Sequence, residues 1–211
     1  MRLRHKPWAK DKIMEYRDIV IPNPQKYAGK WALSFQNGAP LHLEIGTGKG
    51  RFLAESAKQF PDVLFIGMEK MESIIVSALD KVLEAEVENA KLLHEDAREL
   101  PMFFAEGEVD RIYLNFSDPW PKNRHEKRRL THANFLKQYE SVLKPEGEIH
   151  LKTDNRGFFQ YSLESFQEYG LAVKNISWDL HKSAMKDNVM TEYEQRFSEK
   201  GQPIYRCEAH F

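Results

Sequence analysis

The sequence predicts an α/β fold: a seven-stranded, mostly parallel sheet with helices on both faces. Two observations lead to this prediction. Apolar stretches with the period of strands alternate with stretches of helical period along the whole chain, and the first clear strand runs directly into a glycine-rich turn and a helix. At 211 residues the chain is long enough to bury one sizeable core. We expect a basic N-terminal arm at residues 1–30 and a single domain at residues 31–211.

The glycine-rich turn lies in the stretch LHLEIGTGKG, residues 41–50. Apolar residues alternate with polar ones from Leu41 to Ile45, which indicates a strand. Three glycines follow at alternate positions, and residues 51–60 have the apolar spacing of a helix. A strand, a glycine turn and a helix together bring backbone N–H groups and a helix N-terminus to a nucleotide-like ligand.

The other elements follow from the same periodicities. Further strands are expected at residues 63–70, 90–96, 109–116, 149–154, 171–177 and 203–211, and further helices at residues 71–89, 130–144 and 157–168. The last of these strands is expected to lie antiparallel at an edge of the sheet. Residues 178–202 are polar and are expected to be irregular. Pro22 and Pro24 exclude a regular helix or a central strand around them.

The spacing of the glycines decides which ligand the turn suits. A dinucleotide-binding turn has the pattern G-x-G-x-x-G, and here Arg51 stands at its last position. A phosphate-binding loop has the pattern G-x-x-x-x-G-K-[ST], which Leu43 and Gly50 break. The stretch Glu44–Gly50 has the pattern E-x-G-x-G-x-G, which resembles the first motif of class I S-adenosylmethionine-dependent methyltransferases. A turn with a structural role alone is the alternative.

The composition is that of a soluble globular protein, with 41% hydrophobic residues and no apolar run near the roughly 20 residues that a membrane span needs. No apolar segment follows the basic N-terminus, which argues against a signal peptide. The single cysteine, Cys207, excludes an internal disulfide framework. We therefore expect a cytoplasmic protein with no membrane partner. The eight histidines are scattered and form no ligand cluster with Cys207, so no metal site is expected.

Two compact basic clusters contrast with a net charge of −1. Residues 1–12 hold five lysines and arginines against one aspartate, and residues 122–129 hold five against one glutamate. A basic run is often only solvated surface. The presence of two, one of them beside the best catalytic candidate, favours a polyanionic partner. The run at residues 122–129 is expected to be disordered without that partner.

Acidic residues follow three of the predicted strands. Glu69 comes about 20 residues after the glycines, where a carboxylate can accept from both hydroxyls of a ribose. Asp96 ends the third strand and can accept from an adenine amino group. Asp118, in the stretch SDPWP, ends a central strand, and ligands of parallel sheets lie beyond the carboxyl ends of the strands. The alternatives are ordinary polar loops and an Asp-Pro turn beside a buried tryptophan.

In several motifs the chain resembles bacterial tRNA (guanine-N7-)-methyltransferases. These are, in order, Glu44-x-Gly46-x-Gly48-x-Gly50, Glu69, Asp96, Ser117-Asp118-Pro119-Trp120-Pro121-Lys122, Lys152-Thr153-Asp154 and Thr191-x-Tyr193-Glu194. The resemblance covers essentially the whole chain, and the block FSDPWPK is its most specific part.

The resemblance implies the Rossmann-like fold of class I methyltransferases, S-adenosyl-L-methionine as cofactor and the guanine of the tRNA variable loop as target. The residues implied for the cofactor are Glu44, Gly46, Gly48, Glu69, Asp96 and Asp118, and Asp118 is also implied as catalytic. The residues implied to hold the guanine are Lys122, Asp154, Thr191, Glu192, Tyr193 and Glu194. The residues implied to contact RNA are Arg124, His125, Glu126, Lys127, Arg128 and Arg129. The sequence leaves a monomer and a homodimer both open.

The chemistry of guanine agrees with these residues. Guanine N7 has a free lone pair and no proton at neutral pH, so its methylation needs no general base. We therefore hypothesise that Asp118 acts by orientation and electrostatics. Two other functions stay open: a class I methyltransferase acting on another RNA base, and a non-catalytic RNA-binding module. An enzyme that methylates an exocyclic amine would be expected to have a second proline where Trp120 stands. A binding module would leave Glu44, Glu69 and Asp118 without a function.

Overall fold

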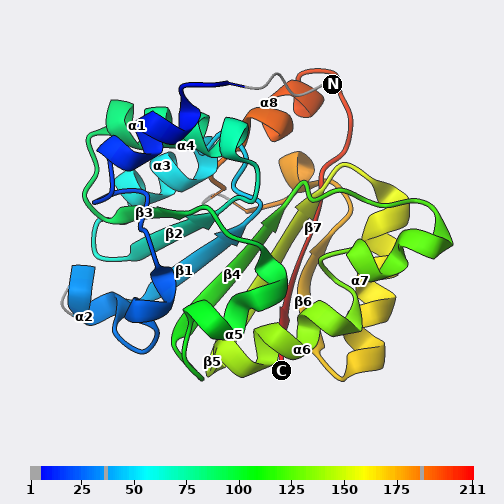
Figure 1. The fold of residues 1–211 in the computed structure, drawn as a ribbon. Coiled ribbons are helices and arrows are strands. Elements are labelled where there is room, and N and C mark those ends of the chain that lie inside the picture. Colours follow the sequence, from blue (N-terminus) through cyan, green and yellow to red (C-terminus); the bar gives the residue numbers. More distant parts are fainter. Residues whose placement is uncertain (1–5, 36–37, 186–187) are drawn as a thin grey trace.

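In the computed structural model, residues 6–35, 38–185 and 188–211 are described, and they form one sheet with helices on both sides (Figure 1). The strands are β1 (Leu41–Ile45), β2 (Leu64–Met68), β3 (Ala90–Leu93), β4 (Val109–Asn115), β5 (Leu143–Thr153), β6 (Ala172–Ser177) and β7 (Tyr205–His210). The α-helices are α1 (Ala9–Glu15), α2 (Trp31–Phe35), α3 (Arg51–Gln59), α4 (Glu72–Ala85), α5 (Leu100–Phe103), α6 (Ala133–Val142), α7 (Arg156–Tyr169) and α8 (Glu192–Ser198). Short 3₁₀ helices are η1 (Pro24–Tyr27), η2 (Ala97–Glu99), η3 (Asn123–Arg128) and η4 (Leu180–Lys182).

The strand order is β3-β2-β1-β4-β5-β7-β6, so the prediction of a seven-stranded, mostly parallel sheet is confirmed. β7 is antiparallel to β5 and to β6, as expected for the C-terminal strand. Its predicted place at the edge is wrong, because β6 is the edge strand and β7 lies inside the sheet. The burial of the two strands agrees: four of the six residues of β7 are buried, whereas four of the six residues of β6 are exposed.

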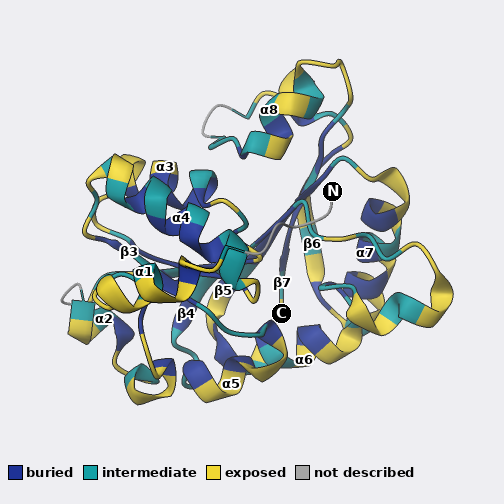
Figure 2. Cartoon of the chain, turned by 45° about the horizontal axis from the view of Figure 1, so that its top comes forward, coloured by how far each residue is buried: buried dark blue, intermediate teal, exposed yellow. Residues whose placement is uncertain are grey.

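The helices form two layers, one on each face of the sheet (Figures 1 and 2). α3 and α4 pack against each other and against β2 and β3, and α1 packs on α4. On the other face lie α5, α6 and α7, and the larger apolar core forms between these helices and the inward side chains of β1, β4 and β5, such as Leu43, Leu114 and Leu151. A second core between the sheet and α3 and α4 contains Leu53 and Leu79. The strands therefore bury apolar side chains on both faces, as parallel strands commonly do.

The expected N-terminal arm packs on the domain in its described part. Ala9 and Val20 are buried, and Val20 forms a parallel bridge with Leu92 of β3. Lys6 and Lys12, two members of the first basic cluster, bond to Ser77 and Asp80 of α4. Arg2 and Arg4 of that cluster lie outside the described residues. The part of the arm after residue 5 thus belongs to the packed structure around α4.

The expectation that residues 178–202 are irregular is wrong for the described part of this stretch. It contains η4 and α8, and the side chain of Thr191 caps α8 by accepting from the Glu194 N–H. The capping pattern Thr-x-x-Glu is a helix start that the overall polarity of the stretch conceals. Among the described residues, none of the helices combines the length and the apolar character that a membrane span requires.

Candidate active site

The glycine turn after β1 has a bare backbone that faces open space. Gly46 and Gly48 have φ values of 75° and 57°, in the left-handed region that glycine adopts freely. A Cβ atom at Gly46 would meet nothing within 4 Å, and one at Gly48 would meet only the Gly46 carbonyl oxygen at 3.9 Å. The turn therefore leaves room for a ligand to approach the main chain closely.

Glu44, near the end of β1, is buried next to this turn, and its carboxylate is already hydrogen-bonded within the protein. Its side chain accepts a hydrogen bond from Thr47 Oγ1 at 2.5 Å and another from Asn115 Nδ2 at 2.8 Å. Glu44 is only 3% exposed, and burial raises the pKa of its carboxyl to about 7. The family resemblance implies that Glu44 contacts the cofactor. In the structure, the Glu44 carboxylate links the glycine turn to β4 through its bonds to Thr47 and Asn115.

The raised pKa of Glu44 makes stability depend on pH. A carboxyl whose pKa is 4.5 when unfolded and about 7 when folded stabilises the fold fully below pH 4.5, and this contribution is lost as the pH rises through 7. We expect the free energy of unfolding of Glu44→Gln, relative to the wild type, to rise between these pH values by on the order of 3 kcal/mol. Urea unfolding at a series of pH values measures this. A difference that does not vary with pH would contradict it.

Glu69 and Asp96 flank the turn from β2 and β3. Glu69 follows β2 and accepts from the Met71 N–H at 2.9 Å and from the backbone of Gly48, while burial raises its pKa. Asp96 stands beyond the end of β3, where it caps η2. Arg98 Nη2 donates to Asp96 at 2.8 Å, and Arg98 holds the pKa of this carboxyl below its usual value. The structure thus brings Glu69 to the glycine turn and pairs Asp96 with a neighbouring cation.

Asp118 stands on the turn that ends β4, next to β1 in the sheet. Phe116 and Trp120 have φ values of 53° and 42°, an unusual backbone for bulky residues that places strain beside Asp118. The Phe116 N–H donates to the Lys152 carbonyl oxygen at 2.8 Å, which ties this turn to β5. Asp118 is exposed, and its carboxylate has no hydrogen-bond partner within residues 6–35, 38–185 and 188–211. It is free to meet a ligand, in contrast to Glu44.

The residues assigned to the guanine fall into exposed and buried groups. Lys122 and Tyr193 are exposed, and Asp154 is half-buried directly after β5. Glu192, in the first turn of α8, is half-buried, whereas Thr191 and Glu194 are buried. The Tyr193 ring lies nearly parallel to that of Phe116, with the ring centroids 6.4 Å apart. Nothing in the sequence around Phe116 indicates this contact, because the two rings are far apart in the chain.

The basic run after Asp118 forms η3, so the prediction that it is disordered without RNA is wrong. Arg124, Lys127 and Arg128 are exposed, and the Arg128 guanidinium lies 4.9 Å from the centre of the Trp120 ring. His125 and Glu126 are half-buried. Arg129 points back to the protein: its Nη2 donates to the Trp120 carbonyl oxygen at 3.1 Å, and its guanidinium lies 4.1 Å from the centre of the Tyr161 ring. Cation–π contacts and the carbonyl bond therefore stabilise the run.

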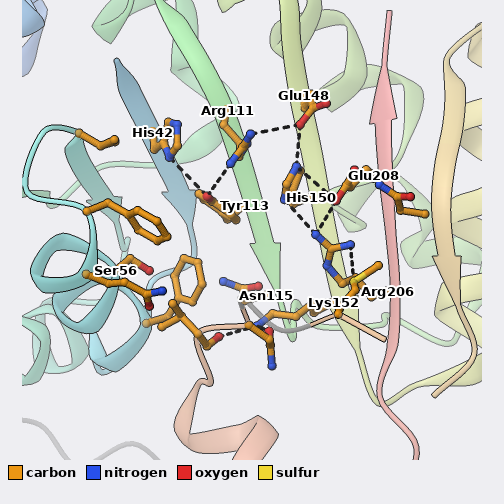
Figure 3. A pocket seen from close by; sticks show the side chains of 18 residues that line it. His42, Ser56, Arg111, Tyr113, Asn115, Glu148, His150, Lys152, Arg206 and Glu208 are labelled. Carbon is orange, nitrogen blue, oxygen red and sulfur yellow. Dashed lines mark hydrogen bonds and ion pairs between the residues drawn. The ribbon is translucent and has the colours of Figure 1, made fainter. Parts of the chain in front are cut away.

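Polar side chains of β1, β4, β5 and β7 line a cavity of about 710 Å³ on one face of the sheet (Figure 3). Burial lowers the pKa values of His42 and His150 to about 4, so both are neutral at pH 7. Ligand atoms of Glu148, His150 and Glu208 lie within 4.8 Å of one another, a grouping that could hold a metal ion. Sequence reasoning missed it because these residues come from two strands that are distant in the chain.

Cations of the protein already neutralise this carboxylate pair. Lys174 Nζ lies 2.6 Å from Glu148, and Arg206 Nη2 lies 2.5 Å from Glu208. Arg111 Nη2 also lies 3.3 Å from Glu148. An added divalent cation would have to compete with these positive charges, so the grouping is a poor metal site.

Solved structures of other methyltransferases have the same fold. One from Aquifex aeolicus, described as dependent on S-adenosylmethionine, aligns over 98% of both chains with a TM-score of 0.57 and 15% identity. An antibiotic-related methyltransferase aligns over 87% of this chain and 94% of its own, with a TM-score of 0.65 and 16% identity. Residues 38–207 also match the family model described as "Putative methyltransferase". The family model and the shared fold place this chain among methyltransferases with a Rossmann-like fold.

Relatives with similar sequences show which family of methyltransferases the chain belongs to. The chain is 59% identical over 211 residues to a tRNA (guanine-N(7)-)-methyltransferase of Geobacillus sp. (strain WCH70), covering 100% of this chain and 96% of the relative. It is 59% identical over 209 residues to the same enzyme of Geobacillus kaustophilus (strain HTA426), covering 99% and 96%. The chain therefore belongs to the tRNA (guanine-N(7)-)-methyltransferase family. The resemblance noted from the sequence motifs is confirmed.

Proposed function

We propose that this protein transfers the methyl group of S-adenosylmethionine to N7 of a guanine in tRNA, and that its target is the guanine of the variable loop. The observation that carries the proposal is Asp118, an exposed carboxylate without a partner in the described chain, on a turn beside the bare glycine turn. Action on tRNA would place the protein in the cytoplasm.

The residues around the glycine turn fit S-adenosylmethionine. Gly46 and Gly48 leave open space in which a Cβ atom would otherwise stand, and Glu69 lies beside them as an acceptor for hydroxyls. We assign Asp96 and Asp118 to the same ligand. S-adenosylmethionine supplies a methyl group that its cationic sulfur makes electrophilic. Carboxylates suit such a cation, because an ionised carboxylate is negatively charged and only accepts hydrogen bonds.

The chain needs to orient the guanine and to support the positive charge that its ring acquires. N7 has a free lone pair, so the protein does not have to remove a proton before transfer. The carboxylates of Asp118 and Asp154 can accept from the guanine N1–H and amino group. Lys122, after β4, and Tyr193, on α8, are both exposed and can contribute further contacts. Neutral adenine lacks N1–H, so these acceptors favour guanine.

We assign the exposed cations of η3 to tRNA phosphates, and this assignment predicts the salt dependence of binding. Lys127→Gln is expected to weaken tRNA binding and to lower the slope of log Kd against log salt by about 1, because one phosphate contact is lost. Arg129→Gln is expected to leave the slope unchanged, since Arg129 is bound to the Trp120 carbonyl oxygen. Lys58→Gln, an exposed lysine in the last turn of α3, is the matched control. Filter binding at four salt concentrations measures the slope, and equal slopes for Lys127→Gln and Lys58→Gln would contradict the assignment.

The proposal is tested by methyl transfer from labelled S-adenosylmethionine to unmodified tRNA, followed by borohydride reduction and aniline cleavage, which break the chain at 7-methylguanine. Cleavage at a single guanine of the variable loop is expected. Incorporation of label into tRNA without cleavage would show that the methyl group is attached to an atom other than guanine N7. Binding of tRNA without any incorporation of label would contradict the proposal and indicate a non-catalytic RNA-binding module.

A further inference from the structure

Lys152, on β5, donates all of its side-chain hydrogen bonds to one segment that is distant in the chain. Its ammonium group donates to Asn188 Oδ1 at 3.0 Å, to the Val189 carbonyl oxygen at 2.8 Å and to Glu194 Oε2 at 2.7 Å. An ammonium has three donors, and here all three bind residues 188–194. Lys152 is 4% exposed, so water does not compete for these bonds.

Glu194, the charged partner of Lys152, is fully buried and engaged on both oxygens. Its second oxygen accepts from Asn188 Nδ2 and lies 3.3 Å from His181 Nε2. Its backbone N–H donates to the Thr191 side chain that caps α8. The Glu194 carboxylate therefore has no free face for a guanine. It serves as an anchor of α8 instead of the contact that the sequence motif implied.

The segment held in this way lies between the two halves of the candidate active site. Gln195 of α8 accepts a hydrogen bond from Arg51, the first residue of the helix that follows the glycine turn. Tyr193, one position before Glu194, is 54% exposed, and its ring lies beside Phe116 at the end of β4. α8 thus contacts the residue that follows the glycine turn and the residue that follows β4, two positions before Asp118.

A buried lysine with a single carboxylate partner is costly unless the geometry is good, and a chain gains little stability from such a pair. The Lys152 side chain could instead have been an apolar one, as at the neighbouring core positions of β5. A buried pair that joins a strand to a distant segment has a clear use in fixing one arrangement of that segment. Here the segment contains Thr191 and Tyr193, which the family resemblance assigns to the target guanine.

We infer that Lys152 is a positioning residue for methyl transfer: its three bonds hold residues 188–194 and the start of α8 over the carboxyl ends of the strands, so that Tyr193 faces the target guanine. This inference rests on the proposed function. Lys152 itself touches neither the base nor the cofactor. Its loss would affect the binding and placement of tRNA and leave the glycine turn intact.

Lys152→Met, in the full-length protein, tests the inference by two readouts. Hydrogen–deuterium exchange of the amides at residues 188–198 is expected to rise by at least about tenfold, with the amides of β1 and α3 unchanged. The KM for tRNA is expected to rise by about tenfold or more while the Kd for S-adenosylmethionine stays within about twofold. Lys174→Met is the matched control, since Lys174 pairs with Glu148 at 2.6 Å on the same sheet and has no bond to residues 188–194.

Two further variants, Glu194→Gln and the double variant of Lys152 and Glu194, test the same inference independently. Glu194→Gln preserves the shape of the anchor and removes its charge, so it is expected to raise exchange and KM in the same direction even if Lys152→Met does not fold. Because the two residues act as a unit, the double variant is expected to raise the KM no further than Lys152→Met alone. Exchange at residues 188–198 that matches the wild type in both single variants, or a loosened segment with a wild-type KM for tRNA, would overturn the inference. A wild-type protein that binds S-adenosylmethionine but methylates no tRNA would instead overturn the proposed function, and the exchange experiment would still decide whether Lys152 holds the segment.

Discussion

Asp118→Ala is expected to lower kcat for methylation of tRNA by about 10²–10³-fold, the range found when one preorganised electrostatic group is removed from an active site. The reason lies in the position of the carboxylate. It stands on the turn after β4, beside the glycine turn, and it has no partner in the described chain that would neutralise it. Its negative charge is therefore available to a guanine ring that becomes cationic as N7 takes the methyl group.

Single-turnover kinetics with labelled S-adenosylmethionine measure this effect, with Asp62→Ala as the control, because Asp62 is exposed in the turn before β2, at the other end of the sheet. Asp118→Asn separates the two roles that a carboxylate can have. If Asp118 orients and stabilises, the wild-type rate is expected to vary little between about pH 7 and 9, since N7 carries no proton. A rate that falls steeply below about pH 7, and that loses this dependence in Asp118→Asn, would show proton abstraction instead.

Gly50→Ala is expected to lower the free energy of unfolding by about 3 kcal/mol, from left-handed backbone strain together with overpacking. Gly50 has a φ of 82°, and a Cβ atom there would lie 2.6 Å from the Cα atom of Ala78 in α4. That neighbour is backbone within a packed helix, so it cannot move aside cheaply. The third glycine of the turn thus serves the packing of α3 on α4, whereas Gly46 and Gly48 face open space.

Gly107→Ala is the matched control for this prediction. Gly107 has a φ of 62°, and a Cβ atom there would meet nothing within 4 Å, so only the backbone cost of about 1 kcal/mol is expected. Urea unfolding of both variants and the wild type measures the difference. Equal losses for Gly50→Ala and Gly107→Ala would mean that α4 moves away from the turn and that the close packing is not required.

Much of this architecture follows from local patterns in the sequence. The strand at Leu41–Ile45, the glycine turn, the helix that begins at Arg51 and the strand that ends before Asp118 were predicted with bounds close to those observed. These elements have clear periodicity and strong stop signals, and such signals act over a few residues. Asp118 was also singled out correctly as a residue at the carboxyl end of a central strand, because the alternation of strands and helices predicts a parallel sheet.

The sequence by itself determined the type and order of the elements, the glycine turn and the motifs that identify the family. Only the tertiary structure decided which strand lies at the edge of the sheet and which carboxylates are free. β7 pairs with β5 and β6 across long stretches of chain, and Glu44 and Glu194 are bound by Asn115 and Lys152, which are distant in sequence. The physical reason is that the periodicity of a segment reports which of its faces is buried, whereas the partner of a buried charge depends on packing between segments that no local pattern encodes.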